Sequence, residues 1–111
     1  MYNKLSKIAP IAISHQELLK QLALTLPDWQ LSSTGKSIIK NYTLPNYENT
    51  WAFLQQVAMR SHLWGHHPSI TTVYNKVKIE LTTHDVNGVS DIDIKLGTKI
   101  DKYASYFINQ K

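Results

Sequence analysis

Apolar residues recur every three or four positions in three segments of the chain, a spacing that places them on one face of an α-helix. The first segment opens with a capping box, in which Ser14 and Glu17 can satisfy backbone groups at the start of a helix. Pro27 closes this segment, because proline cannot continue a helix. We therefore expect a first helix between these signals, with a buried stripe of Leu18, Leu19 and Leu22.

Two further helices are predicted in the same way. Asn46, after Pro45, is a suitable cap for the second helix, and Gly65 can take the left-handed conformation that ends it. The buried face predicted for this helix consists of Tyr47, Trp51, Leu54, Ala58 and Ser61. A second capping box, Ser90 with Asp93, starts the third helix. The buried face predicted there consists of Val89, Ile92, Leu96, Ile100, Tyr103 and Phe107.

Between the helices, short alternating runs predict two pairs of strands. Residues 29–31 and 36–43 flank one turn, and residues 70–74 and 77–84 flank a turn at Asn75-Lys76. In the strand predicted at residues 77–84, we expect one face to be buried and the other to be exposed to solvent. The buried face consists of Val77, Ile79, Leu81 and Thr83, and the exposed face of Lys78, Glu80, Thr82 and His84.

The element order is therefore α-β-β-α-β-β-α. It predicts an α+β fold, a four-stranded antiparallel sheet with three helices packed on one face. Because an open sheet edge invites pairing, we expect a second subunit to cover exposed parts of the sheet.

Composition narrows the classes of function. A chain of 111 residues suits a single domain, expected to span residues 1–111. The lack of cysteine excludes disulfides and thiolate zinc sites, and no apolar run reaches the roughly 20 residues of a membrane span. The net charge of +4 comes from scattered basic residues, so we expect no nucleic-acid partner. The first sixteen residues are basic without any acid, so we expect a cytoplasmic location with a mitochondrial one as the alternative.

Four of the five histidines stand in one spaced pattern, His62-x3-His66-His67-Pro68-x5-Tyr74-x9-His84-x8-Asp93. An unperturbed histidine has a pKa of about 6.5, so it can give or take a proton near neutral pH. Grouped histidines indicate acid–base catalysis or a metal site. A zinc hydrolase of this type needs a nearby glutamate, and residues 59–70 contain no acid, so we expect no metal. Taken singly, each residue also has a structural interpretation, as a helix cap, a turn residue or a strand aromatic.

With its spacing, this pattern resembles that of the pterin-4a-carbinolamine dehydratases. Three further stretches resemble the family's, and Trp29 falls where the family has a tryptophan; the stretches are Val73-Tyr74-Asn75-Lys76-Val77, Thr83-His84-Asp85 and Gly88-Val89-Ser90. The resemblance covers nearly the whole chain. It implies a hydro-lyase that removes water from 4a-hydroxytetrahydropterin, giving quinonoid dihydropterin in tetrahydrobiopterin recycling. It also implies no cofactor, and a homodimer or homotetramer.

The same resemblance implies a role for each residue of the pattern. His66 and His84 would be the catalytic acid–base pair, and His67 would hold the substrate and share protons. The residues expected to bind or orient the pterin are His62, Pro68, Thr82, Thr83 and Asp85, and those expected to be structural are Tyr74 and Asp93. Alanine at His66 or His67 is expected to abolish activity and leave the fold intact.

The chain departs from the family pattern at four positions. His62 stands where the family usually has glutamate, Gly65 where it often has aspartate, and Ser69-Ile70 where it has an acidic residue and a tryptophan. We therefore expect slower dehydration. Two alternatives stay open. One is a pterin-binding protein of a related pathway, such as molybdopterin cofactor maintenance. The other is an interaction module, for which Ile94 and Tyr106 are candidates for an exposed apolar helix face.

Overall fold

The computed structural model describes residues 9–108, and the order of its elements agrees with the predicted order. The elements are α1 (His15–Thr25), β1 (Gln30–Leu31), β2 (Ile38–Thr43), α2 (Tyr47–Trp64), β3 (Ser69–Val73), β4 (Lys76–Leu81), the short 3₁₀ helix η2 (His84–Val86) and α3 (Asp91–Ile108). In this part of the chain, no helix is both long and apolar enough to cross a membrane.

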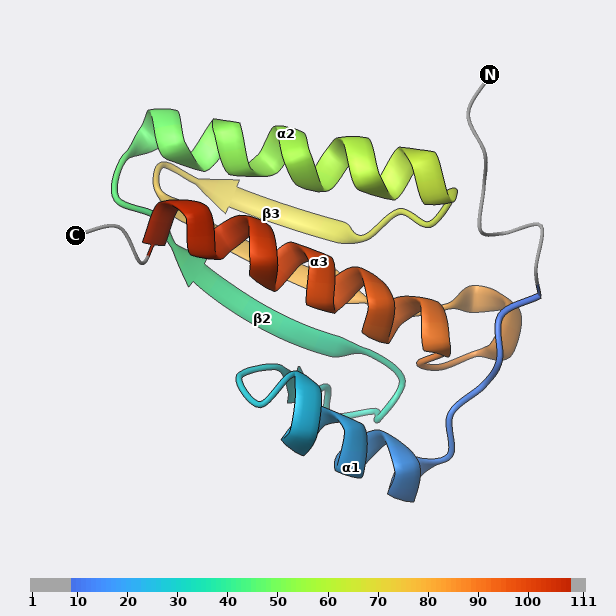
Figure 1. Ribbon diagram of the computed structural model, residues 1–111. Helices are drawn as coiled ribbons and strands as arrows, with labels where there is room; N and C mark the ends of the chain where they lie inside the picture. Colours follow the sequence, from blue (N-terminus) through green and yellow to red (C-terminus); the bar gives the residue numbers. More distant parts are fainter. Residues whose placement is uncertain (1–8, 109–111) are drawn as a thin grey trace.

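The four strands form one antiparallel sheet in the order β1-β2-β4-β3. The central strands β2 and β4 pair from Ile38 opposite Leu81 to Thr43 opposite Lys76. Helices α2 and α3 lie side by side across one face of this sheet, and α1 packs beyond β2 (Figure 1). The predicted α+β fold is confirmed.

Short-range contacts set the helix ends where the sequence predicted them. Ser14 Oγ accepts the Glu17 N–H at 3.2 Å, and Asn46 Oδ1 accepts the Asn49 N–H at 2.8 Å. Gly65 ends α2 with φ of 66°, in the left-handed region that glycine adopts without a steric cost. These signals need no tertiary contact, which is why the sequence reveals them.

The core lies between the helices and the covered face of the sheet. The predicted alternation in and after β4 is confirmed, since Val77, Ile79, Leu81 and Thr83 are all buried. The helices add Leu18, Leu22, Phe53, Val57, Leu96 and Ile100 to the same core. At about 25 cal/mol per Å² of apolar surface removed from water, this burial is the main force that holds helices to sheet.

The buried face predicted for α2 is wrong in part. Tyr47, Trp51 and Ala58 are exposed, and the residues that face the core are Thr50, Phe53, Leu54, Val57 and Ser61. Leu54 and Ser61 agree with the predicted face, whereas Thr50, Phe53 and Val57 lie outside it. Thr50 donates to Asn46 O and Ser61 to Val57 O, each at 2.7 Å, so both hydroxyls are satisfied within the helix and can be buried.

The buried face of α3 is wider than predicted. Ile94, expected to be exposed, is only 9% exposed and belongs to the core, whereas Tyr106 is 46% exposed. Gly97 is also buried, and a Cβ added there would lie 3.0 Å from Leu26 Cδ1. Because α3 lies centrally over the sheet and approaches its neighbours closely, it buries a broader face than one stripe.

The second hairpin differs from the prediction at both ends. Its turn lies at Tyr74 and Asn75 rather than at Asn75-Lys76. Tyr74 has φ of 51°, unusual for a bulky residue, and its ring stacks on that of Tyr47 at 6.3 Å. The neighbouring Asn75 is held by Leu44, whose carbonyl accepts from Asn75 Nδ2 at 2.9 Å. These tertiary contacts stabilise a turn that the local sequence does not favour.

The predicted strand 77–84 is also too long. β4 ends at Leu81, and His84 begins η2 instead of closing the strand. The left-handed conformation of Asn87 turns the chain back, so that Thr83 and Gly88 form an isolated antiparallel bridge. This tight return sets the position of residues 83–90 below the end of α2.

Candidate active site

The end of α2 delivers the first histidines of the pattern. The Gly65 N–H donates to His62 O at 3.1 Å, and the His66 N–H donates to Ser61 O at 3.0 Å. These bonds satisfy the last carbonyls of the helix and reverse the chain. As a result, the side chain of His66 lies against the first turn of α3.

His66 is paired with a buried carboxylate. His66 Nε2 lies 2.6 Å from Oδ1 of Asp93, whose side chain has no solvent exposure. The other oxygen, Oδ2, accepts from Thr83 Oγ1 at 2.7 Å and from the Ser90 N–H at 2.9 Å. A carboxylate this deeply buried is stable only when it is paired and hydrogen-bonded, and both oxygens meet that condition here.

The sequence predicted only part of this arrangement. The bond from Ser90 N to Asp93 is the helix-capping contact that a capping box implies. The bond to His66 joins residues 27 positions apart and was missed. His66 and Asp93 both belong to the spaced histidine pattern. Their place in this pattern is the feature of the sequence that indicates that they lie close together.

This pairing determines what the ring of His66 can do. An ionised carboxylate can only accept a hydrogen bond, so His66 Nε2 is assigned the proton it donates to Asp93. Nδ1 is then the atom with a free lone pair. The ring is held in one orientation and one tautomer, as a general base or acid requires.

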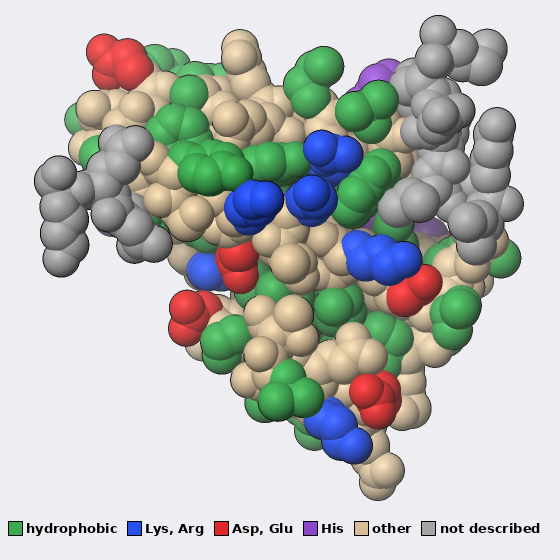
Figure 2. All heavy atoms as spheres, in the orientation of Figure 1, with side chains coloured by type: hydrophobic (Ala, Val, Ile, Leu, Met, Phe, Trp, Pro, Cys, Tyr) green, Lys and Arg blue, Asp and Glu red, His purple; other side chains and the backbone are tan. Residues whose placement is uncertain are grey.

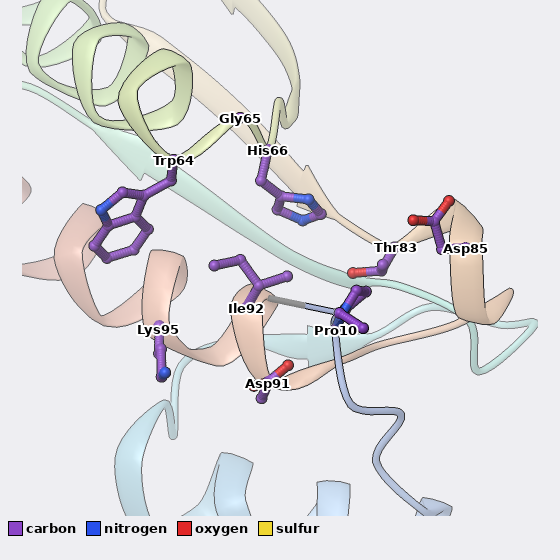
Figure 3. Close-up of a pocket in the computed structure, with 10 residues that line it drawn as sticks. Pro10, Trp64, Gly65, His66, Thr83, Asp85, Asp91, Ile92 and Lys95 are labelled. Carbon is purple, nitrogen blue, oxygen red and sulfur yellow. The ribbon is translucent and has the colours of Figure 1, made fainter. Parts of the chain in front are cut away.

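The ring of His66 lines a cavity of about 120 Å³. Figure 3 shows His66 and Trp64 from the end of α2, Thr83 and Asp85 from the segment after β4, and Ile92 from α3 around this space. It therefore has an apolar part, at Trp64 and Ile92, and a polar part, at Thr83 and Asp85. Such a mixture suits a small planar ligand with hydrogen-bonding groups on its edge.

The remaining histidines of the pattern lie outside this lining. The rings of His62 and His67 contact one another, with centroids 5.8 Å apart, and both side chains are exposed. His84 is exposed at the start of η2. His67 and His84 nevertheless adjoin residues of the cavity wall, His66 on one side and Thr83 and Asp85 on the other.

The other predicted positions divide between scaffold and site. The Thr82 hydroxyl donates to Lys36 O at 2.6 Å, so it ties two loops together. Pro68 is half-buried just before β3. Tyr74 stacks on Tyr47 at the first residue of α2, whereas His66 and His67 follow the end of this helix. Tyr74 is thus about 27 Å along the helix from them, given a rise of about 1.5 Å per residue.

No three His, Asp or Glu side chains among residues 9–108 are arranged to hold a metal ion.

A second aspartate of α3 organises a separate polar network. Asp101 Oδ1 accepts from Trp29 Nε1 at 3.1 Å, Lys40 Nζ at 2.8 Å and the Tyr42 hydroxyl at 2.5 Å. Burial, followed by the hydrogen bond to Asp101, raises the pKa of the Tyr42 hydroxyl far above its ordinary value. This network joins α3 to β2 and to the segment before β1.

Comparison with known proteins agrees with the pattern. The family model described as pterin 4 alpha carbinolamine dehydratase matches residues 12–103. A Saccharomyces cerevisiae protein that carries the family's name is 42% identical over 115 residues, covering 93% of this chain and 95% of the relative. One from Nitrosospira multiformis is 43% identical over 86 residues, covering 78% and 74%.

Two solved structures are similar as well. A Brucella melitensis protein described as a transcriptional coactivator/pterin dehydratase has a TM-score of 0.79 and 27% identity, covering 83% of this chain and 97% of that one. A pterin dehydratase-like protein identified as a RuBisCO assembly factor in the alpha-carboxysome has a TM-score of 0.62 and 23% identity, covering 69% and 89%. At that identity the second comparison concerns the fold alone.

Proposed function

Because the chain belongs to the pterin 4 alpha carbinolamine dehydratase family, we propose that it eliminates water from a 4a-hydroxytetrahydropterin, in the recycling of tetrahydrobiopterin. The observation that carries this proposal is the pairing of His66, on the cavity wall, with the buried carboxylate of Asp93. Family membership supplies the reaction, and the pair supplies a group able to move a proton.

The reaction needs one acid and one base. Protonation of the 4a-hydroxyl breaks the C4a–O bond and releases water. A base removes the proton of a ring N–H, whose electron pair forms the new C=N bond of the quinonoid product. No electron is gained or lost, so the step needs no redox cofactor.

We assign these tasks to His66 and His84. Asp93 accepts the Nε2–H of His66 and stabilises the cationic ring that forms when Nδ1 takes a proton. His84, next to Asp85 on the cavity wall, reaches the ligand from the rim. His67 contributes binding and proton exchange from the opposite rim.

The remaining residues of the pattern bind the pterin or support the site. The pterin edge carries N–H donors, which the Asp85 carboxylate can accept, and Thr83 adds a hydroxyl on the same wall. His62 and Pro68 complete the rim at the end of α2. Thr82 acts indirectly, through the loop it ties to Lys36.

The test is stopped-flow absorbance of freshly generated 4a-hydroxytetrahydropterin, compared with a blank because the intermediate also dehydrates unaided. The wild type should accelerate dehydration, and His66→Gln should not. Glutamine can still donate to Asp93 but cannot act as an acid or base near neutral pH. Equal acceleration by both proteins would show that the reaction does not depend on His66.

A pterin-binding protein without turnover, such as one that maintains molybdopterin cofactors, is the second candidate. It is favoured by the exposure of His67 and His84, neither of which lines the cavity with His66. Tight binding of a stable dihydropterin, without acceleration over the blank, would support this candidate against the dehydratase.

We also propose that the protein self-associates as a dimer or tetramer through the outer face of α2. Exposed hydrophobic side chains, among them Trp51, Met59 and Leu63, lie along this helix beside the one arginine of the chain, Arg60, whereas lysine side chains gather over α3 (Figure 2). Like charges disfavour an α3–α3 contact, so α2 is the better self-complementary surface. Met59→Glu should lower the mass measured by light scattering. An unchanged mass would show that the subunits meet at another surface.

A further inference from the structure

The segment before α1 crosses the first turn of α3 and reaches the cavity. Ile13 N donates to Val89 O at 3.2 Å, and Asp91 N donates to Ile11 O at 3.0 Å. Ala12 and Ser90 form an isolated antiparallel bridge between these bonds. Residues 11–13 therefore pair with residues 89–91 like a short extra strand.

A side chain completes the attachment. The Asp91 carboxylate accepts the Ile11 N–H at 2.9 Å through Oδ1. The Ile11 side chain itself is 65% exposed, so hydrogen bonds rather than burial hold the segment at this point. Two residues further on, Ile13 packs against the core. Few buried apolar contacts and exposed hydrogen bonds, the marks of low local stability, are therefore features of the stretch up to Ile11.

This segment carries Ala9 and Pro10 onto the cavity wall. In Figure 3, Pro10 lies between Ile92 and Thr83, below the ring of His66. Proline has no N–H, so this part of the wall offers an apolar surface without an unsatisfied donor. The family model begins at residue 12, so Ala9, Pro10 and Ile11 lie outside it.

The attachment and the catalytic pair share one stretch of chain. Ser90, which bridges to Ala12, also donates its N–H to Asp93, and Asp93 holds His66. Asp91 lies between them and fixes Ile11. A change in residues 9–13 therefore acts close to the ring of His66, but it removes none of the hydrogen bonds that His66 makes.

We infer that Ala9 and Pro10 form a substrate-contacting wall of the site, and that Asp91 is the positioning residue that holds this wall in place. The inference rests on the proposed function in taking the ligand to be a pterin. The wall covers part of the planar ring and limits the access of water to it. Its loss should weaken binding more than it slows the chemical step, since no proton passes through it.

The experiment compares Asp91→Ala with Asp91→Asn. Asparagine keeps an Oδ1 that can accept the Ile11 N–H, whereas alanine does not. Hydrogen exchange at the Ile11 and Ile13 amides reports release of the segment. KM and kcat for dehydration, with the Kd of a stable 7,8-dihydropterin, report its effect on the site. Pro10→Gly tests the wall without touching α3.

We expect Asp91→Ala to speed exchange at Ile11 and to raise KM and Kd about five- to tenfold, the loss of roughly one ordinary contact. The change in kcat should stay within about twofold on the same reasoning. Asp91→Asn should behave like the wild type, and Pro10→Gly should raise Kd without faster exchange at Ile13.

Three outcomes would overturn the inference. They are faster exchange with unchanged KM and Kd, unchanged exchange in Asp91→Ala, and a wild type that binds no pterin. A wild type that binds pterin but does not dehydrate it would end the proposed function alone. In that case the Kd values of the three variants would still decide whether the wall contacts the ligand.

Discussion

Asp93 and Asp101 lie about two turns apart on α3, and each accepts several hydrogen bonds from other elements, but the two networks end in different groups. Asp101 receives Trp29, Lys40 and Tyr42. Indole does not titrate, and burial raises the pKa of the Tyr42 hydroxyl far above its ordinary value. This network contains no histidine and joins α3 to β2 and to the segment before β1.

The network of Asp93 also has three partners, but they differ from those of Asp101 and divide between the two carboxylate oxygens. Thr83 and Ser90 hold one carboxylate oxygen, as scaffold contacts do, but the other oxygen meets His66. Histidine is the side chain that titrates near neutral pH, and this one lines a cavity. The difference between the two aspartates is therefore in what their networks reach, a histidine beside a cavity for Asp93 and strand side chains for Asp101.

The largest expected effect follows from replacing His66. His66→Gln should lower the rate of dehydration about 10²- to 10⁴-fold, the usual contribution of one acid–base group, and change stability little. His66→Ala should lower the rate equally and also cost about 1–3 kcal/mol, because the buried Asp93 loses a donor. Stopped-flow rates and urea unfolding measure the two effects. A stable, inactive alanine variant would show that Asp93 does not need this partner.

Asp93→Asn should come next. The amide oxygen can still accept from Thr83 and Ser90, but the amide group facing His66 no longer favours the tautomer with a protonated Nε2. We expect kcat to fall about 10- to 100-fold, with a changed pH profile, since the imidazolium loses its counter-charge. The measurement is kcat against pH beside the wild type. A lower kcat with an unchanged profile would leave Asp93 a purely structural role.

Asp101→Asn provides the matched control on the other network. It removes the charge that pairs with Lys40 while keeping an oxygen for Trp29 and Tyr42, so we expect a loss of about 1–2 kcal/mol in the free energy of unfolding. The rate of dehydration should stay within about twofold, because the affected contacts do not reach the cavity. Urea unfolding and the stopped-flow assay together check this. A large loss of activity would mean that the two networks are coupled through α3.

The smallest effect is expected for Tyr42→Phe. It removes one of three hydrogen bonds to Asp101 and leaves the ring packed against Phe53, at a centroid distance of 5.2 Å. We expect a loss of about 0.5–1.5 kcal/mol and full activity. The free energy of unfolding from urea titration tests this. A loss as large as that of Asp101→Asn would show that this one hydrogen bond provides most of the stabilisation by the network.

Features that depend on a few neighbouring residues could be predicted from the sequence. The caps of α1 and α2, the left-handed Gly65 and the buried alternation of β4 all follow from local geometry. The order of elements follows from the same signals. The spaced pattern of histidines indicated where the chemistry lies, and it identified the family before any geometry was known.

Features that depend on contacts between distant segments could not be predicted. The burial of Thr50, Phe53 and Val57, the turn at Tyr74 and the core position of Ile94 depend on which face of each helix or hairpin meets a neighbour. A hydropathy pattern records the polarity of a side chain, but not whether a hydroxyl is satisfied within its own helix. The helical spacing fits the face of Tyr47 and Trp51 as well as that of Phe53 and Val57, and only packing on the sheet distinguishes the two.

The candidate site shows the same division. The sequence by itself determined the residue types, the family and the helix cap at Ser90 and Asp93. Only the tertiary structure decided that Asp93 faces His66, that Asp101 joins α3 to β2, and that Ala9 and Pro10 reach the cavity. The physical reason is the separation along the sequence of the residues that meet. Capping bonds join residues three or four positions apart, whereas the pairing of His66 with Asp93 forms only after α2, β4 and α3 have packed together.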